Sequence, residues 1–342
     1  MAARFNPSMR AMVLTQSSDV GRNPLALQDV PAPDPGRDEV RMRVHVCGVC
    51  RTDLHVVEGD LPPSKRPLIP GHEVVGVVDR VGTRVRTVKE GDRIGIAWLR
   101  DTCGQCEFCR SGRENLCERA QFTGYQWDGG YAEYAVVPAA FAYPIPPLFK
   151  DGEAAPLLCA GIIGFRALRL SEVKPGENLG LYGFGASAHI TIQVAKHWGC
   201  KVFVCSLREE HRQLACDLGA AWVGGADEQP PEKLHGAIMF APVGELVPPA
   251  LRALRRGGTV ALAGIHMTPI PALDYDRDVF GERTIRSVTA NTKQDGLDLL
   301  AAAAAIPIRP HTQRFTLEHA NTALQALKAG TINGAAVLTV AG

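Results

Sequence analysis

Residues 178–188 read Asn178-Leu179-Gly180-Leu181-Tyr182-Gly183-Phe184-Gly185-Ala186-Ser187-Ala188. The apolar run at the start of this stretch predicts a short strand, and the residues that follow, as far as Trp198, have a helical pattern. The glycines between the two elements match Gly-x-Gly-x-x-Gly/Ala, the fingerprint of a dinucleotide-binding unit. Such a turn is typical of a parallel sheet that binds a nucleotide at the amino terminus of a helix.

The small residues of this turn have distinct predicted roles. Gly183 makes the tight turn, Gly185 lets the backbone approach a pyrophosphate, and Ala188 lets the helix pack closely on the strand. The fingerprint alone also occurs in ordinary turns, so its weight depends on the surrounding sequence. The predicted cofactor-binding turn comprises Gly183, Phe184, Gly185, Ala186, Ser187 and Ala188.

The sequence around the turn supports a doubly wound sheet. Short apolar runs alternate with helical segments from about Glu177 onward, which is typical of a parallel sheet covered on both faces. We expect a six-stranded sheet of this kind. Its further predicted strands are Lys201–Cys205, Ala237–Phe240, Thr259–Gly264 and Thr284–Thr289.

The first part of the chain has a different sequence pattern. Short Val-rich runs separated by Gly and Pro predict an all-β body, and no long helix is evident. The runs are Glu39–Val46, Val74–Val81, Arg93–Trp98 and Tyr131–Val137. The helical run 295–305 and the closing segment 315–340 are expected to return to this body. The predicted domains are therefore a catalytic zinc-binding domain, residues 1–158 and 293–342, and a dinucleotide-binding domain, residues 159–292.

Length and composition agree with two globular domains. The chain has 342 residues, and its formal net charge of +1 gives it no electrostatic reason to bind nucleic acid or a membrane surface. The segment Met1–Asn6 does not resemble an export signal, and the apolar run Leu299–Ile306 stops at Pro307, far short of a membrane span. We expect a cytoplasmic protein.

Four of the ten cysteines predict a structural zinc site. They have the spacing Cys103-x2-Cys106-x2-Cys109-x7-Cys117, in a stretch without apolar periodicity. Four thiolates would fill the tetrahedron of a structural zinc ion. An iron–sulfur cluster or free thiols are the alternatives, but the position of the fourth cysteine does not fit the ferredoxin pattern. With zinc ligands in such number, a reducing compartment is expected.

A second, catalytic zinc site is predicted around Cys50. The residues from Cys50 to His55 bring a thiol, a hydroxyl, a carboxylate and an imidazole into six positions. His72 and Cys159 supply the further ligands of a Cys2His set, which leaves the fourth position open for water or substrate. Cys47 and Cys50 also form a Cys-x-x-Cys pair, but no thioredoxin-like context surrounds it.

Together these motifs resemble the zinc-containing medium-chain alcohol dehydrogenases. The resemblance covers nearly the whole chain, and it rests on the order and spacing of five segments. It implies a GroES-like catalytic domain, a Rossmann domain, two zinc ions per chain and NAD or NADP as cofactor. The segments are 50–55, 71–73, 103–117, 158–161 and 183–188.

The resemblance also implies roles for individual residues near Cys50. Thr52 and His55 match a proton relay, Asp53 matches a carboxylate that hydrogen-bonds His72, and Glu73 matches a residue beside the metal. Arg51 matches a contact to the cofactor pyrophosphate. Taken singly, Thr52 could be a strand residue, His55 a surface histidine and Arg51 a solvated charge; their coincidence within a few positions favours the functional interpretation.

Trp98 and Leu61 match positions of the family's substrate pocket. Such a pocket favours primary alcohols and their aldehydes, with secondary alcohols and ketones as the alternative. Core packing is the competing interpretation of Trp98. The chain departs from the family at Ala335, where many members have an arginine that contacts the pyrophosphate, so cofactor binding would depend more on Arg51 and on the helix terminus.

The expected cofactor depends on the residue that ends the strand 201–205. NAD-dependent members have a carboxylate there, and this chain has Ser206. Ser206 removes the charge that would repel a 2′-phosphate, while Arg208, with His211 and Arg212, supplies cations to bind it. NADP is therefore somewhat favoured, although Ser206 could also hydrogen-bond the ribose of NAD.

Two other functions compete with this interpretation. A zinc-free quinone or enone reductase would share the fold but would lack the zinc ligands. A non-enzymatic, zinc-stabilised binding protein would need only the cysteine lobe, and it would leave Thr52 and His55 unexplained. The expected partner is a small alcohol or aldehyde, and the resemblance implies a homodimer or homotetramer.

Overall fold

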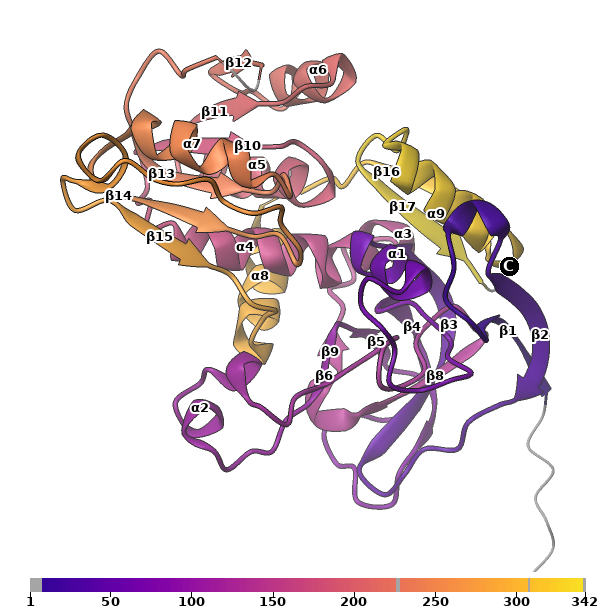
Figure 1. Cartoon of the computed structure of the whole chain (residues 1–342). Coiled ribbons are helices and arrows are strands. Elements are labelled where there is room, and N and C mark those ends of the chain that lie inside the picture. Colours follow the sequence, from indigo (N-terminus) through magenta and orange to yellow (C-terminus); the bar gives the residue numbers. More distant parts are fainter. Residues whose placement is uncertain (1–7, 226–227, 307, 341–342) are drawn as a thin grey trace, which may run out of the picture. The chain divides into compact units, whose positions relative to one another are not determined.

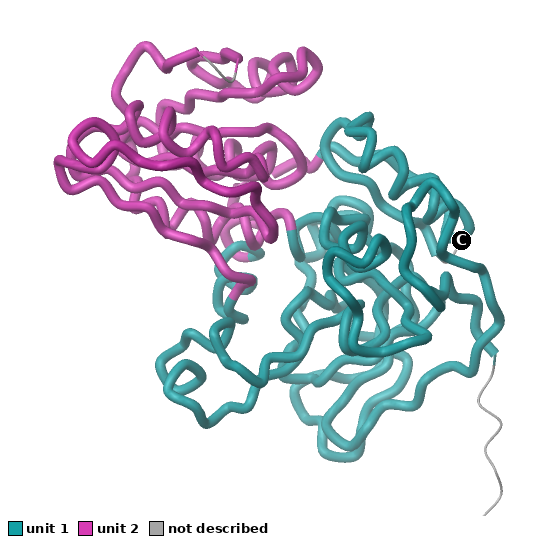
Figure 2. Tube along the Cα trace, in the orientation of Figure 1, with its two compact units in different colours: residues 1–159, 292–300, 311–342 teal, residues 160–291, 301–310 magenta. Residues whose placement is uncertain are grey.

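The computed structural model describes residues 8–225, 228–306 and 308–340. The segment Met1–Asn6, which the sequence analysis compared with an export signal, and Pro307 lie outside the described residues. The chain divides into two compact units (Figure 2). Unit 1 comprises Met1–Cys159, Thr292–Leu300 and His311–Gly342, and unit 2 comprises Ala160–Asn291 and Ala301–Pro310.

Unit 1 is built on a seven-stranded sheet with the order β16-β17-β3-β4-β5-β9, in which β8 also pairs with β3 (Figure 1). The central strand β3 alternates valine and methionine with polar residues, and Val40, Met42 and Val44 are fully buried in the unit's core. The strands of this sheet are β3 (Glu39–Val49), β4 (Glu73–Val81), β5 (Arg93–Ile96), β8 (Tyr134–Pro138), β9 (Tyr143–Pro144), β16 (Thr312–Thr316) and β17 (Ala335–Thr339).

Two smaller ribbons and several helices complete unit 1. The ribbons pair β1 (Ser8–Leu14) with β2 (Leu25–Pro31), and β6 (Leu99–Asp101) with β7 (Gln121–Phe122). The helices are α1 (Arg51–Glu58), α2 (Glu107–Arg110), α3 (Asp151–Ala154) and α9 (Ala320–Ala329), and the 3-10 turns are η1 (Val20–Arg22), η2 (Glu114–Leu116), η3 (Ala139–Phe141), η4 (Ala155–Leu158) and η7 (Leu317–His319).

Unit 2 contains a six-stranded sheet, ordered β12-β11-β10-β13-β14-β15, in which every pair is parallel. Its strands are β10 (Asn178–Tyr182), β11 (Lys201–Cys205), β12 (Trp222–Gly224), β13 (Leu234–Met239), β14 (Leu254–Leu262) and β15 (Thr284–Ser287). Its helices are α4 (Ala160–Leu170), α5 (Ala186–His197), α6 (Glu209–Asp217) and α7 (Val247–Ala253), with the short turns η5 (Gly244–Leu246) and η6 (Tyr275–Val279).

The predicted fold class, a β-rich domain plus a doubly wound parallel sheet, is confirmed. β10 and β11 have the predicted bounds, whereas β12 supplies a sixth strand that the sequence did not predict. The helix α8 (Lys293–Ala305) begins in unit 1 and ends in unit 2, so the segment 301–310 does not group with the rest of the predicted catalytic domain. Within the described ranges, no helix has the length and apolarity needed to cross a membrane.

Candidate active site

The helix α1 begins at the residues that the sequence analysis singled out. Cys50 precedes its first turn, and the side chain of Asp53 accepts a hydrogen bond from the backbone N–H of Cys50 at 2.9 Å. This reciprocal cap satisfies a donor that the helix itself leaves without a partner. Thr52 and Asp53 are buried as a result, and Cys50 lies at the point where β3 passes into the helix.

Three predicted zinc ligands, distant in sequence, lie together within unit 1. The Sγ atoms of Cys50 and Cys159 are 3.8 Å apart, and Nε2 of His72 is 3.2 Å from Sγ of Cys159. His72 follows Gly71, whose φ of 97° favours glycine, and Cys159 follows η4. With Glu73, these ligand atoms all lie within 4.8 Å of one another. Two thiolates, an imidazole and a carboxylate form a donor set that fits zinc.

Glu73 reaches this cluster because residue 48 is glycine. Gly48 on β3 pairs with Glu73 on β4, and a Cβ atom at Gly48 would lie 1.8 Å from Oε2 of Glu73. No other residue type fits beside the carboxylate without displacing it. Glu73 is only 3% exposed, so its charge lies close to the thiols and away from bulk water.

The outer nitrogen of His72 is bound by Asp53, as the resemblance implies. Nδ1 of His72 lies 2.9 Å from Oδ1 of Asp53, and both side chains are buried. Burial is the largest single effect and opposes protonation of His72, but the charge and hydrogen bond of Asp53, together with those of Cys50, outweigh it and hold the pKa of His72 well above its ordinary value. A bond of this kind fixes the ring tautomer and leaves Nε2 available to a metal.

The thiols of Cys50 and Cys159 differ in pKa. The neighbouring Cys159 thiol lowers the pKa of Cys50 well below its ordinary value; burial opposes this shift, and His72 reinforces it. The same contact raises the pKa of Cys159. Of the two thiols, Cys50 is thus the more readily ionised, and thiolate is the form that binds zinc.

The two predicted relay residues lie on one face of α1. Thr52 and His55 are three residues apart, the spacing that brings helix side chains together. The hydroxyl of Thr52 lies 3.8 Å from Sγ of Cys50, and Nδ1 of His55 lies 2.9 Å from Oδ2 of Asp60. The side chain of His55 is 16% exposed, whereas Thr52 is buried. Arg51, on the same helix, is exposed.

Trp98 contacts the predicted zinc ligand His72 directly. Its ring meets His72 edge-on, with centroids 5.0 Å apart, and is stacked on Phe122 at the same centroid distance. Tyr125 lies against Trp98 at 5.9 Å. The sequence analysis missed Phe122 and Tyr125, and the aromatic cluster around Trp98 could have been sought in the residues after Cys117. Leu61, the other predicted pocket residue, packs partly buried against the core of unit 1.

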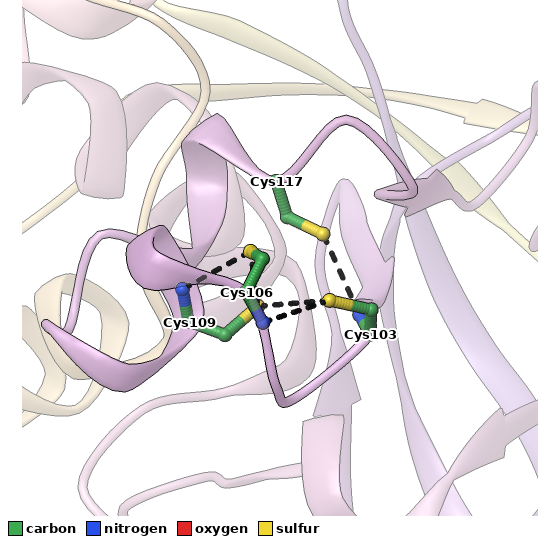
Figure 3. A group of neighbouring side chains, drawn as sticks. All are labelled: Cys103, Cys106, Cys109 and Cys117. Atoms are coloured by element: carbon green, nitrogen blue, oxygen red, sulfur yellow. Dashed lines mark hydrogen bonds between the residues drawn. The ribbon is translucent and has the colours of Figure 1, made fainter.

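The four-cysteine lobe brings its thiols together (Figure 3). The Sγ atom of Cys109 lies 3.8 Å from that of Cys103 and 3.5 Å from that of Cys106. With Cys117, all four sulfur atoms lie within 4.8 Å of one another. Backbone N–H of Gln105, followed by Arg119, lowers the pKa of Cys103 to about 5. The donor set and its N–H groups fit a closed zinc site.

The predicted cofactor turn lies between β10 and α5. Gly183 has a φ of 88°, and a Cβ atom there would lie 2.8 Å from the backbone nitrogen of Ala241, so glycine is required. The space around Gly185 is open within 4 Å, and Ala188 is fully buried. These features agree with the roles predicted for a tight turn, a close ligand approach and a packed helix.

Ser206 follows β11, where its backbone N–H donates to the carbonyl of Gly224 at 2.9 Å. Arg212 donates to the carbonyl of Ser206 at 3.1 Å and also pairs with Glu209. Arg208, the other arginine predicted to bind a 2′-phosphate, is the residue immediately before α6.

Comparison with known proteins covers both units. Residues 36–147 match the alcohol dehydrogenase GroES-like domain family, and residues 188–305 match the zinc-binding dehydrogenase family. The probable alcohol dehydrogenase AdhA of Mycobacterium tuberculosis is 51% identical over 97% of this chain and 98% of its own. An alcohol dehydrogenase of Geobacillus stearothermophilus is 38% identical over 97% of this chain and all of its own.

A solved structure shares the fold over a similar length. The cobalt- and zinc-bound thermostable alcohol dehydrogenase of Pyrobaculum aerophilum superposes with a TM-score of 0.88 at 28% identity. The match covers 97% of this chain and 100% of that one. The likeness thus extends through both units.

Proposed function

Because this chain belongs to the zinc-containing medium-chain alcohol dehydrogenase family, we propose that it is a zinc-dependent oxidoreductase that interconverts primary alcohols and aldehydes with a nicotinamide cofactor. Secondary alcohols and ketones are the alternative substrates. The observation that carries this proposal is the cluster of Cys50, His72 and Cys159, with Asp53 bound to the outer nitrogen of His72. The Pyrobaculum aerophilum relative is described as cobalt- and zinc-bound, which supports metal binding by this chain.

A zinc ion held by Cys50, His72 and Cys159 would supply a Lewis acid that lowers the pKa of the alcohol, and the nicotinamide would accept the hydride. The residues around the three ligands orient them and shape the site. Asp53 holds His72 in one tautomer, and Trp98 forms an apolar wall beside the imidazole. Glu73 supplies a carboxylate within reach of the ligand atoms.

The proton released from the alcohol must leave a buried site. We assign this step to Thr52, whose hydroxyl takes up the proton while it releases its own, and to His55, which receives the released proton and passes it to solvent. The burial of Thr52 and the partial exposure of His55 support this direction of transfer. The hydrogen bond between Nδ1 of His55 and Oδ2 of Asp60 fixes the orientation of this imidazole.

The cysteine lobe is proposed to hold a second, structural zinc ion. The four thiols and the Cys50 cluster together favour the zinc enzyme over the zinc-free reductase of the wider superfamily. Zinc ligation needs reduced thiols, and every cysteine of the chain is free. These features support a cytoplasmic location.

For the cofactor we propose NADP in preference to NAD, with Arg51, the glycine turn, Ser206 and Arg208 as the binding residues. Ser206 carries no charge against a 2′-phosphate, and Arg208 lies two residues further along. Ala335 begins β17 as a buried residue and offers no cation of its own. Arg51 and the amino terminus of α5 are then the main groups for the pyrophosphate.

We further propose that two copies associate through β15, as a homodimer or as the building block of a homotetramer. β15 is an edge strand of the unit 2 sheet, and all four of its residues are exposed. Tyr275, Phe280 and Ile285 are 67%, 57% and 37% exposed on the same segment. An open edge with exposed apolar side chains favours pairing with a second copy.

Metal analysis of purified protein tests the central proposal. We expect about two zinc ions per chain in the wild type and about one in His72→Ala, which should retain its circular dichroism but lose alcohol oxidation. Cys216→Ala is the control, because this exposed thiol lies in unit 2 and should leave zinc content and activity unchanged. Full activity in His72→Ala would exclude the catalytic assignment.

A further inference from the structure

The carboxylate of Asp53 has three hydrogen-bond donors in the structure. Its Oδ1 lies 2.9 Å from Nδ1 of His72, and its Oδ2 accepts from the backbone N–H of Cys50 at 2.9 Å. The third donor is the hydroxyl of Tyr131, 3.3 Å from Oδ2. Asp53 and Tyr131 are 1% and 0% exposed, so bulk water does not compete for these contacts.

We propose that Tyr131 is a positioning residue for the metal centre, which acts through Asp53 on His72. The inference rests on the proposed zinc enzyme, because it concerns the orientation of a zinc ligand. Two donors on Oδ2 leave Oδ1 to face the imidazole. The plane of the carboxylate is thereby fixed, and with it the tautomer and ring angle of His72.

The backbone holds Tyr131 in a place where it can do this. Its N–H donates to the carbonyl of Pro70 at 3.0 Å, and its carbonyl accepts from Met12 at 2.8 Å. Its ring also lies against Gly71, where a Cβ atom would be 2.4 Å from Cδ1 of the ring. Tyr131 therefore packs on the residue before His72 and bonds the carboxylate that holds His72.

The expected size of the effect follows from the geometry. The distance of 3.3 Å from the Tyr131 hydroxyl to Oδ2 of Asp53 is longer than the usual 2.5–3.0 Å of such a hydrogen bond. We therefore expect this contact to restrict the rotation of the carboxylate without binding it strongly. Direct partners of metal ligands typically contribute about 10- to 100-fold to metal affinity or activity. Tyr131 contacts Asp53 and not the ligand His72 itself, so we expect a smaller effect on zinc retention and activity, roughly 3- to 10-fold.

The variant Tyr131→Phe removes only the hydroxyl, and Tyr182→Phe is its matched control. Tyr182 is also buried, at 1% exposure, but its hydroxyl has no hydrogen-bond partner among the residues that the structure describes. In Tyr131→Phe we expect EDTA to remove the catalytic zinc roughly 3- to 10-fold faster, and kcat to fall more than KM changes. The visible spectrum of the cobalt-substituted protein should shift as well. Tyr182→Phe should leave all three readouts unchanged.

A double-mutant cycle with Asp53→Asn separates positioning from general packing. If Tyr131 acts through Asp53, adding Tyr131→Phe to Asp53→Asn should accelerate zinc loss little further. If Tyr131→Phe acted only through a packing defect, it would accelerate zinc loss by the same factor in the wild type and in Asp53→Asn. This holds even where Tyr131→Phe lowers the stability of the protein. Such additivity, or wild-type zinc retention and kcat in Tyr131→Phe, would overturn the proposal.

The wild-type protein tests the underlying function separately. Absence of zinc from the Cys50 centre in wild-type protein would overturn both the proposed function and the role of Tyr131. Zinc bound and alcohol oxidised by the wild type, with Tyr131→Phe indistinguishable from it, would overturn the role of Tyr131 alone.

Discussion

Ser206 shows how one side chain can determine which cofactor is bound. It follows β11 with 6% of its surface exposed, at the position where a carboxylate would meet the adenosine ribose. A neutral hydroxyl tolerates either a ribose hydroxyl or a 2′-phosphate. In the proposed function, the charge of Arg208, two residues along the chain, favours the 2′-phosphate, since guanidinium groups bind phosphate in a bidentate manner.

Ser206→Asp should therefore reverse the cofactor preference. The new carboxylate would repel the 2′-phosphate and accept from the ribose hydroxyls, so the ratio of kcat/KM with NADP to that with NAD should fall at least about ten-fold, or about 1.4 kcal/mol. Steady-state kinetics with both cofactors measures this ratio. Ser111→Asp, in the cysteine lobe, is the control, and its ratio should equal that of the wild type. A wild-type preference for NAD of ten-fold or more, again about 1.4 kcal/mol, would contradict the proposal.

Several residue roles could be proposed from the sequence because ligands of zinc are few in kind and their spacing is regular. Tyr131 could not, because its importance comes from a contact with Asp53, far away in sequence. Gly48 also escaped notice. Its role depends on the register of β3 and β4, which places it beside the carboxylate of Glu73.

At the scale of elements, the sequence predicted the regular strands better than the segments around the site. β10 and β11 are continuous apolar runs, and their bounds agree with the prediction. The helix α1 was missed because its eight residues are too few for a helical period, and because Asp53 stabilises its first turn through a side chain. The predicted strand 131–137 begins only at Tyr134, since Tyr131 hydrogen-bonds the loop at Pro70 instead of the sheet.

We expect the stability of the cysteine lobe to depend on the proposed structural zinc ion. Of its residues 102–119, only Asn115 and Cys117 are buried, so little apolar core would remain without zinc. The lobe is anchored at its base by β6 and β7, and Phe122 of β7 stacks on Trp98. A loss of structure in the lobe should therefore also disturb the packing of Phe122 on Trp98, beside His72.

Cys106→Ser should remove the zinc of this lobe and open it. We expect trypsin to cleave at Arg110 or Arg113 at least about ten-fold faster than in the wild type, because the local free energy of opening falls when the metal is lost. Mass spectrometry of the fragments identifies the cleaved bonds. Cys216→Ser serves as the control and should resist cleavage in the lobe as the wild type does. Equal cleavage rates in Cys106→Ser and wild type would show that the lobe holds its structure without metal.

At the scale of the whole molecule, we propose the β15 edge of the unit 2 sheet as the place where a second copy binds. β15 pairs only with β14 among the described strands, so the outward N–H and C=O groups of β15 are available for pairing. The chain carries a formal charge of only +1, which gives copies little reason to repel one another.

Ile285→Lys should convert the assembly to monomers. A lysine in the middle of β15 would bring like charges together across a two-fold axis and would cost burial of the isoleucine. Light scattering with size-exclusion chromatography should then report a mass near 36.7 kDa in place of a multiple of it. Leu148→Lys, at an exposed apolar position in unit 1, should keep the wild-type mass. An oligomer of unchanged mass in Ile285→Lys would show that the copies meet elsewhere.

The pairing of β3 with β17 has a consequence for the order in which a newly made chain can fold. Val46–Val49 of β3 pair with residues 336–339, from the far end of the chain. At about 5–20 residues per second, a ribosome needs on the order of 10–30 s to pass from Cys159 to β17. All the predicted zinc ligands thus leave the ribosome while the last four residues of β3, next to Cys50, still have an uncovered edge. Unit 2, whose strands are complete by Ser287, can form in that interval, so the nascent catalytic unit is the part that needs protection from aggregation and from premature metal binding.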